Sequence, residues 1–413
     1  MPAGDATIAA LTNILKTRYD QKVFHQLFYK KAPFAGQVEK DTEFGGNNSR
    51  ISLRYGAPQG GSFTFANAQA NATSSSDVAF LLTRARDYQV SGISGEAIRA
   101  GKGDEDTIYN SLRGEMEGSM RNLNRSIQIS LWRNGGGQRG QGNSSYTITG
   151  ATATLAQVAD IVGFEVGMKC DFSADDGYNN GGALAGIRSG GPLTVLAVDR
   201  TAGTITFTQN ISPTLSGVTN ADYIFRNGDY SFGMAGVARW LPSTAPTTGD
   251  NHFGVDRSVD TVRLAGIRYT GNGGNKEETL IDAAELAGRE GAEELSAFIN
   301  NLDRADIVKS LGSKAVYEPT SSTDGDIGYR ALNVEGPDGT IKVYSDVNVP
   351  RGKFYLLDMS TWVLKSAGKF PGLLDDDGLQ MIRESNADGY QWRMGGYPQL
   401  GCEAPGLNLA GTW

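Results

Sequence analysis

The sequence predicts an α+β fold with an all-β module in its middle, and three patterns predict it. Apolar residues recur at helical spacing along residues 104–133. Short β patterns separated by turns fill residues 144–229. Helical runs and then antiparallel strand patterns follow in blocks after residue 277, without the βαβ alternation that indicates a parallel sheet.

The composition of the 413 residues, enough for two or three structural units, argues against several classes of protein. Lys and Arg total 38 against 46 Asp and Glu, a net charge of −8, which does not suit a DNA reader that neutralises many phosphates. Hydrophobic residues make up 39% and charged residues 20%, too apolar for a disordered chain. No apolar run approaches the ~18 residues of a membrane span. The 55 glycines follow no triplet period, so they predict turns and extended loops instead of collagen.

The two cysteines, Cys170 and Cys402, lie far apart and in no metal or redox spacing. This usage fits a reducing compartment in which thiols stay free. The N-terminus has neither the charged nor the apolar region of a signal peptide. We therefore expect the product to stay in the cytoplasm of the cell that makes it.

The N-terminal quarter predicts a helical arm and an extended hairpin. Apolar residues at helical spacing run along residues 8–34, where Pro33 is expected to stop the helix. Residues 50–55 alternate like a strand, and Val78, Phe80 and Leu82 do the same beyond a polar stretch at 56–76. A loop of this length is uncommon inside a compact domain, so we expect the hairpin to lie on a neighbouring molecule.

The longest helix is predicted at residues 104–133. Its apolar residues fall on one face: Ile108, Leu112, Met116, Met120, Leu123, Ile127 and Leu131. Acidic residues at 104–106 suit the start of a helix, Arg125 and Arg133 suit its end, and Asn134 with Gly135 closes it. At 1.5 Å per residue the helix spans roughly 45 Å, enough to serve as the backbone of a domain.

The following segment reads as an all-β module of about 85 residues, a small barrel or sandwich. Its predicted strands are residues 146–149, 193–198 and 204–208, with a hairpin turn at 199–203 and a short helical piece at 155–162.

The second half predicts helices and then antiparallel strands. Helical runs occupy residues 277–287, 292–302 and 305–311. Leu332 and Val334 are expected to face Ile341 and Val343 across the turn at 336–339. Residues 354–357 make a further strand.

Candidate sites for chemistry are few. Residues 135–140 match G-x-G-x-x-G, yet they follow a helix end instead of a strand, so we interpret them as a connector. His25 and His252 have no nucleophile motif to partner, and are interpreted as surface or packing residues. The acidic runs 175–176 and 375–377 lack the ligand spacing of a calcium loop and are interpreted as solvated turns.

The C-terminal aromatic residues are interpreted as strand core and interface packing, because too few cations lie among them for a single-stranded DNA platform. They are Trp362, Phe370, Tyr390, Trp392, Tyr397 and Trp413. The sequence thus predicts no enzyme, and no catalytic, cofactor-binding or metal-binding residue.

The order of these parts resembles the major capsid proteins of tailed bacteriophages, which have the Hong Kong 97-type fold. Residues 51–90 look like the extended loop of that family, and residues 104–133 look like its spine helix. Residues 131–137 resemble the end of that helix and the glycine loop after it. Residues 234–242 look like the segment that follows this loop in simpler members, so the β module stands where some members have an insertion domain.

The module itself is similar to such insertion domains at residues 195–200 and 222–229. In the second half, residues 280–302 with the turn at 300–303 resemble the second peripheral helix and the way into the axial domain. Residues 339–355, with a P-x-G turn at Pro350, resemble the strands that build the axial domain.

The resemblance implies a division of the chain into seven parts. They are an N-terminal arm (1–46), an extended hairpin loop (47–92), the spine helix with peripheral domain (93–143), an inserted β-barrel-like domain (144–229), the peripheral domain continued (230–303), the axial domain (304–375), and a peripheral return strand with the C-terminus (376–413).

The resemblance also implies a function. It implies a coat protein that self-assembles as hexamers and pentamers into the icosahedral head around double-stranded DNA, without sequence-specific DNA binding, cofactor or membrane. It implies assembly in the host bacterial cytoplasm, a portal protein as partner, and room for a decoration protein. Because only about 50 residues precede the hairpin, it implies a separate scaffolding protein.

Two alternatives stay open. An encapsulin-like bacterial nanocompartment shell would share the fold and package an enzyme, and terminase, portal and tail genes nearby would argue against it. A carbohydrate-active or adhesive protein would bind its ligand through the β module, and glycan binding by residues 144–229 alone would favour it.

Overall fold

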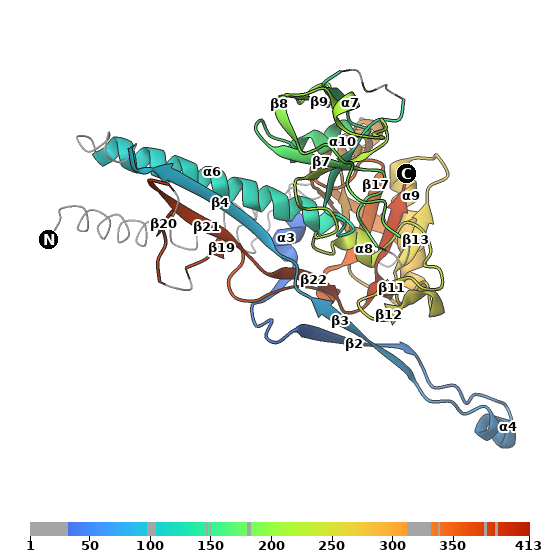
Figure 1. Cartoon of the computed structure of the whole chain (residues 1–413). Helices are drawn as coiled ribbons and strands as arrows, with labels where there is room; N and C mark the ends of the chain where they lie inside the picture. Colours follow the sequence, from blue (N-terminus) through green and yellow to red (C-terminus); the bar gives the residue numbers. More distant parts are fainter. Residues whose placement is uncertain are drawn as a thin grey trace.

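The computed structural model describes residues 32–96, 105–145, 148, 150–179, 183–311, 332–337, 339–375, 378–384 and 387–413. They form a broad body from which one hairpin projects (Figure 1). The helical arm predicted at 8–34 lies outside the described residues up to residue 31. The short helix α3 (Pro33–Gln37) begins at Pro33, and Ala32 before it is not helical; the helix that Pro33 was expected to stop falls on residues outside the described ones. Proline suits the first helical turn because the N–H it lacks would have no partner at that position.

The predicted hairpin is confirmed. Strands β2 (Asn48–Gly56) and β3 (Ser76–Thr83) pair antiparallel, with Ile51 opposite Phe80. The tip between them holds a short helix, α4 (Phe65–Ala70). The hairpin ends at Thr83, however, earlier than the predicted boundaries at 90 and 92. The next strand, β4 (Asp87–Ser94), instead finds an eight-residue antiparallel partner in β21 (Gly389–Gly396), far along the chain.

The long helix is also confirmed, as α6 (Glu105–Trp132), which runs beside β4 (Figure 1). The predicted apolar residues from Met116 onward are all buried: Met116, Met120, Leu123, Ile127 and Leu131. The side chains of Ile108 and Leu112 lie outside the described part. Gly135 ends the segment with a φ of 87°, in the left-handed region that favours glycine. Beneath the helix, β19 (Gly372–Leu373) and β20 (Ile382–Arg383) pair with β21.

The middle of the chain forms a small barrel, which we call the barrel below. Its strand order is β5 (Gln138–Gln141), β10 (Tyr223–Arg226), β7 (Lys169–Ser173), β8 (Leu193–Asp199), β9 (Thr204–Phe207) and β6 (Thr152–Thr154), with antiparallel neighbours. A bridge between Gly142 and Leu155 joins the two outer strands and closes the sheet on itself.

The interior of the barrel is apolar and separate from the rest of the core. Large residues that fill it include Leu155, Phe164, Phe172, Phe207 and Ile224. The helical piece expected at 155–162 is a 3₁₀ helix, η1 (Val158–Gly163), and a short α7 (Ile211–Thr214) follows β9. The strand predicted at 146–149 falls mostly outside the described residues.

The second half forms a six-stranded mixed sheet. Its order is β13 (Ile267–Thr270), β23 (Leu409–Thr412), β17 (Lys353–Asp358), β14 (Leu295–Ile299), β16 (Gly339–Ser345) and β15 (Leu332–Gly336). The predicted register is confirmed, because Leu332 pairs with Val343 and Val334 with Ile341. The expectation of antiparallel pairing throughout was wrong: β13 runs parallel to β23, and β14 parallel to β16.

Helix α9 (Lys276–Arg289) confirms the first predicted helix of this half and packs Leu280, Ala283 and Ala287 into the core of the mixed sheet. Helix α10 (Asn301–Leu311) includes the third. The helix predicted at 292–302 was wrong, because its central residues are strand β14 (Leu295–Ile299), which lies inside the sheet. Ala297, Phe298 and Ile299 are all fully buried, and a continuous apolar run of this kind suits a strand covered on both faces.

The mixed sheet also crosses the predicted boundaries at residues 303/304 and 375/376. It takes strands from residues 267–299 and 409–412, while β18 (Trp362–Ser366) belongs to a different, three-stranded sheet. That sheet has the order β1 (Glu39–Asp41), β18 and β22 (Pro398–Cys402). The predicted boundaries differ from the observed sheets because these sheets pair strands that are far apart in the sequence. Such pairing produces no local pattern in the sequence.

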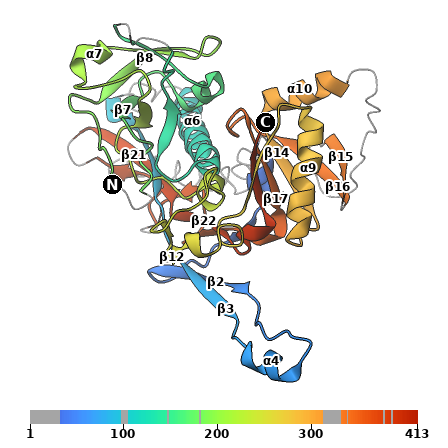
Figure 2. The same cartoon turned by 90° about the vertical axis from the view of Figure 1, so that its right-hand side faces the viewer.

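Short elements complete the body: α8 (Val237–Trp240), β11 (Asn251–His252), β12 (Val255–Asp256), and the 3₁₀ helices η2 (Arg257–Val259), η4 (Met359–Thr361) and η5 (Pro405–Leu407). Trp362 and Trp392 are buried in the main core, as expected for the C-terminal aromatics. Figure 2 shows the barrel and the mixed sheet as two lobes, with the hairpin leaving the body below them. Among the described residues, no helix is both long and apolar enough to span a bilayer.

Candidate functional site

The histidine that the structure describes, His252, is a core residue. It is fully buried, its Nδ1 accepts a hydrogen bond from Arg239 Nε at 3.2 Å, and its ring lies 4.5 Å from that of Trp240. Burial, and then the charges of Arg257 and Arg239, hold the pKa of His252 well below 6.5. The ring is therefore neutral at pH 7. His25 lies outside the described residues.

The other candidates for chemistry are occupied by structural contacts. Asp175 accepts hydrogen bonds from the Tyr230 hydroxyl at 2.7 Å and the Gly177 N–H at 3.0 Å. Asp176 accepts from Asn134 Nδ2 at 2.6 Å. Asp376 and Asp377 lie outside the described residues. Within the described part of the chain, no three His, Cys, Asp or Glu side chains gather as a metal site would require.

Both cysteines are free and buried. Burial is the main cause that raises the pKa of Cys170 and of Cys402 to about 12. Such thiols are protonated at neutral pH and inert as nucleophiles. Of the segment 135–140, the glycines Gly135, Gly136 and Gly137 connect α6 to the barrel, whereas residues 138–140 are already part of β5.

The hairpin tip is the first candidate for an interaction site. Residues 57–75 include no charged residue, and Phe63 and Phe65 there are almost completely exposed. The base of the same hairpin is fixed in the core, where the Phe80 ring lies 5.0 Å from that of Trp240. The tip therefore lies at the end of an arm that is anchored in the core (Figures 1 and 2), and it exposes two large aromatic side chains.

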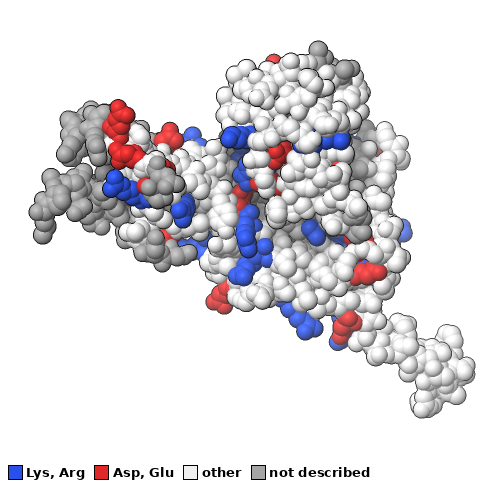
Figure 3. Space-filling model, viewed as in Figure 1, with Lys and Arg blue, Asp and Glu red and all other residues white. Residues whose placement is uncertain are grey.

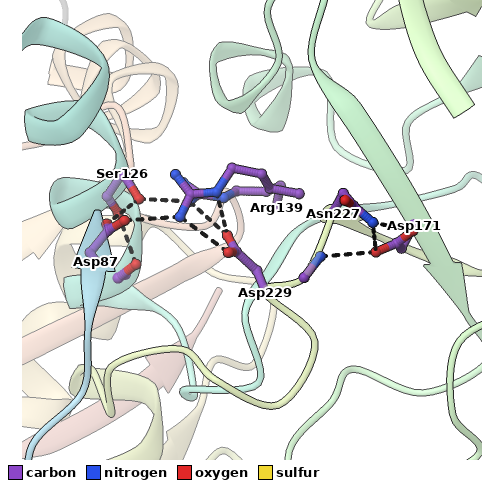
Figure 4. Close-up of polar contacts among 9 residues, drawn as sticks. Asp87, Ser126, Arg139, Asp171, Asn227 and Asp229 are labelled. Atoms are coloured by element: carbon purple, nitrogen blue, oxygen red, sulfur yellow. Dashed lines mark hydrogen bonds and ion pairs between the residues drawn. The ribbon is translucent and has the colours of Figure 1, made fainter. Parts of the chain in front are cut away.

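A polar junction is the second feature, and it joins β4, α6 and the barrel (Figure 4). Arg139 of β5 donates to Ser126 of α6 at 2.7 Å and lies 3.3 Å from Asp229. Arg226 of β10 lies 2.9 Å from Asp87 of β4 and 2.8 Å from Asp229. Ser126 also donates to Asp87. Each charge at this buried contact thus has an opposite partner, which offsets much of the cost of its burial.

The surroundings shift the pKa values of Arg139 and Arg226 in opposite directions. Burial, and then repulsion from Arg226, lower the pKa of Arg139. Burial acts on Arg226 in the same sense, but the charges of Asp87 and Asp229 more than offset it and raise the pKa of Arg226. A third contact beside them fixes the end of β10, where Asn227 Nδ2 donates to Asp171 at 2.9 Å (Figure 4).

A groove of about 750 Å³ runs along this junction. It is lined by residues 84–90, by one side of the last turns of α6, and by the loop at 226–234. On the face seen in Figure 3, Lys and Arg side chains gather in a band below the barrel. Sequence reasoning did not find this junction, because Asp87 and Arg226 lie 139 residues apart and no local pattern relates them.

Comparison with known proteins finds no matching family model and no matching curated protein. Among solved structures, the chain is similar to the cyanophage A-1(L) capsid asymmetric unit at 12% identity, with 90% of this chain and 89% of that chain covered and a TM-score of 0.49. It is also similar to Mycobacterium phage Che8 (9% identity, 92% and 90% covered, TM-score 0.39). A third likeness is to a virus-like particle from Pyrococcus furiosus (8% identity, 94% and 96% covered, TM-score 0.38). Because every one of these TM-scores lies below 0.5, an assignment of function has to come from the architecture of the chain itself.

Proposed function

We propose that this chain is the major capsid protein of a tailed double-stranded DNA bacteriophage, with the Hong Kong 97-type fold and an inserted barrel. The observation that carries the proposal is the hairpin: its base is part of the core, while its uncharged tip exposes Phe63 and Phe65 far from the body. The long helix, the glycine connector and the mixed sheet follow in the order that the resemblance implies.

The projecting tip supports self-assembly because no described residue of its own chain covers Phe63 or Phe65. Exposed apolar side chains of this size gain free energy when another surface removes them from water. If the tip of each copy docks on a different surface of the next copy, the contact is heterologous, and repetition around an axis closes a ring. Rings of six and five copies are the hexamers and pentamers of an icosahedral head.

The net charge supports a DNA container. Proteins that bind a DNA duplex strongly through its phosphates gain affinity from the release of counterions, and this needs many positive charges. A chain with a net charge of −8 does not suit such binding, so a shell built from it encloses a genome without sequence-specific binding. The partners we propose are further copies of the chain, a separate scaffolding protein, a portal protein and a decoration protein.

We also propose that the barrel is an inserted domain. The points at which the chain enters and leaves the barrel are adjacent, because the Ser231 N–H donates to the Gly136 carbonyl oxygen at 2.8 Å. The barrel has a core of its own, whose residues all come from the segment between these two points. This supports an insertion between α6 and α8 that leaves the remainder of the fold unchanged.

The test is particle formation. We expect the purified wild-type protein, viewed by negative-stain electron microscopy, to form closed shells. Deletion of residues 60–75 should leave a folded protein with the wild-type melting temperature that cannot close shells. As a matched control, Asn67→Ala with Gln69→Ala changes the same tip without touching its aromatics and should assemble normally. Normal particles from the deletion would refute the proposal.

A further inference from the structure

Besides the charged groups of the junction, the lining of the groove contains two exposed arginines and several apolar side chains. Arg84 and Arg86 are exposed and line the groove just before β4; neither has an ion-pair partner among the described residues, although the Arg84 guanidinium lies 5.6 Å from the centre of the Phe44 ring. The apolar part is formed by Tyr88, Val90 and Phe232, all exposed, with Phe232 at 74%. A surface that leaves these groups in water is suited to a partner with acidic groups around an apolar centre.

Helix α9 presents the complementary pattern on its outer face. Glu278, Ile281, Asp282 and Glu285 lie at positions i, i+3, i+4 and i+7, the spacing of a single helix face, and all four are exposed. Ile281 is the apolar residue of this face. Residues 276–294 hold seven acidic residues against two basic ones.

The two basic residues of that segment do not neutralise the outer face. Lys276 is engaged by Asp303 at 2.7 Å and Asp306 at 2.9 Å, on α10. Arg289 pairs with Glu285 at 2.7 Å. Glu278 and Asp282 therefore remain free of ion pairs among the described residues, although each accepts a hydrogen bond, from Asn275 and from Tyr269.

The groove and α9 cannot meet within one molecule. Figure 2 shows α9 on one lobe, and α6 and the barrel, which flank the groove, on the other. The basic band faces the viewer in Figure 3, while Figures 1 and 2 together place α9 toward the opposite flank. Two surfaces on opposite flanks of one subunit can meet only between copies, and such a contact repeats around a ring.

We propose that the outer face of α9 in one copy docks in the groove of the next copy within a capsomer, with Glu278 and Asp282 opposite Arg84 and Arg86. The spacings are compatible: four helical residues rise about 6 Å, and two residues of chain span at most about 7 Å. Ile281, next to Asp282, then lies nearest Tyr88, two residues beyond Arg86, in the helix-in-groove mode of recognition. This inference rests on the proposed function, since it names the surface by which the coat subunits pair.

The test reverses the charges on each side and then on both. We expect Arg84→Glu with Arg86→Glu to reduce the yield of closed shells at least tenfold. Glu278→Arg with Asp282→Arg should do the same. The four changes together restore the opposite charges, and should restore at least half of the wild-type yield, measured by sedimentation and negative-stain microscopy.

The controls distinguish an effect of the reversed charges at the contact from an effect on folding. Arg121→Glu with Lys369→Glu makes the same change of net charge at exposed positions away from the groove and should assemble normally. Circular dichroism melting of each variant checks folding, and Arg84→Gln with Arg86→Gln replaces the reversal if that variant does not fold. The glutamine pair should lower the yield and make the remaining assembly less sensitive to salt, since screening acts on the removed pairs.

The possible outcomes separate a failure of this contact from a failure of the proposed coat-protein function. Wild-type yield from either reversed pair, or from the glutamine pair if it is needed, would overturn the contact while leaving the coat-protein function in place. Failure of the four-residue variant to recover, although it folds, would also overturn it. A wild-type protein that forms no shells at all would overturn both.

Discussion

The two ends of the hairpin formed by β2 and β3 lie in opposite environments. At the base, Ile51, Phe80 and Leu82 are buried in the main core. At the tip, Phe63 and Phe65 are almost completely exposed to solvent. The same pair of strands thus joins a part that is buried in the core of the subunit to a part that the described residues leave in water.

Stability and assembly are therefore encoded in different parts of the hairpin. Changes at the base or in α6 should alter the free energy of unfolding, because those side chains are buried in the monomer. Changes at the tip should alter assembly and leave the free energy of unfolding nearly unchanged. The four predictions below test this separation, beginning with the largest expected change in stability.

Phe80→Ala should produce the largest loss. The side chain is fully buried and packs edge-on against Trp240, so truncation should lower the free energy of unfolding by about 3–5 kcal/mol through lost burial and the cavity left behind. Urea unfolding measures the change. Leu81→Ala, on the next, exposed position of the same strand, should change stability by no more than about 0.5 kcal/mol. Equal effects of the two changes would mean that the base is not core.

Leu123→Ala should lower stability by about 2–5 kcal/mol, because Leu123 is buried in the middle of the α6 stripe. Arg121 is an exposed neighbour, so Arg121→Ala should leave both melting and shell formation close to wild type. Arg121→Pro should cost about 3 kcal/mol or more, because it removes a backbone donor from the helix interior. If Arg121→Ala melted early and Leu123→Ala did not, the buried face of α6 would be the other one.

Alkaline pH should destabilise the body without involving the tip. Burial is the main cause that raises the pKa of Cys170, Cys402 and Tyr355 to about 12, against 9.0 for an ordinary thiol and 10.0 for a tyrosine. Since the folded state holds these protons more tightly, their contribution to stability is complete below pH 9 and is lost as pH rises through about 12. Melting temperatures from pH 8 to 12 should fall in parallel for wild type and for the deletion of residues 60–75. A deletion variant that resisted alkali would contradict this.

Phe63→Ser with Phe65→Ser should have the smallest effect on stability, within about 0.5 kcal/mol, because both side chains are already in water. The yield of closed shells should nevertheless fall sharply. Thermal melting and negative-stain microscopy on the same preparation measure both quantities. Wild-type shell yield would show that the aromatics of the tip are dispensable, and that its backbone or length matters instead.

The sequence predicted the elements whose signals are local. The stripe of α6, the alternation of β2 and β3, and the register of β15 against β16 all lie within short windows, and the structure has each of them. Strand β14 was mistaken for a helix because a short run of buried apolar residues has no period that separates the two. What decides its state is the pairing with β16 and β17, which come more than 40 residues later.

The candidate sites followed the same division. The exposed hairpin tip was predicted from its length and polarity. The junction of Asp87, Ser126, Arg139, Arg226 and Asp229 was not, because its charges come from three segments that only the fold brings together. An isolated arginine in a strand pattern gives no signal of burial, so neither this junction nor the groove beside it could be read from the sequence.

The chain enters and leaves the barrel at two neighbouring points, and this has a practical consequence for engineering. Because Gly136 and Ser231 are hydrogen-bonded neighbours, the body presents a single gap a few ångströms wide, in which any polypeptide with adjoining ends should fit. A foreign hairpin or a small binding domain could therefore replace the barrel, provided that Asp87 and Ser126, which would lose Arg139 and Arg226, receive new partners or are made apolar. Each assembled shell would then display as many copies of that graft as it has subunits.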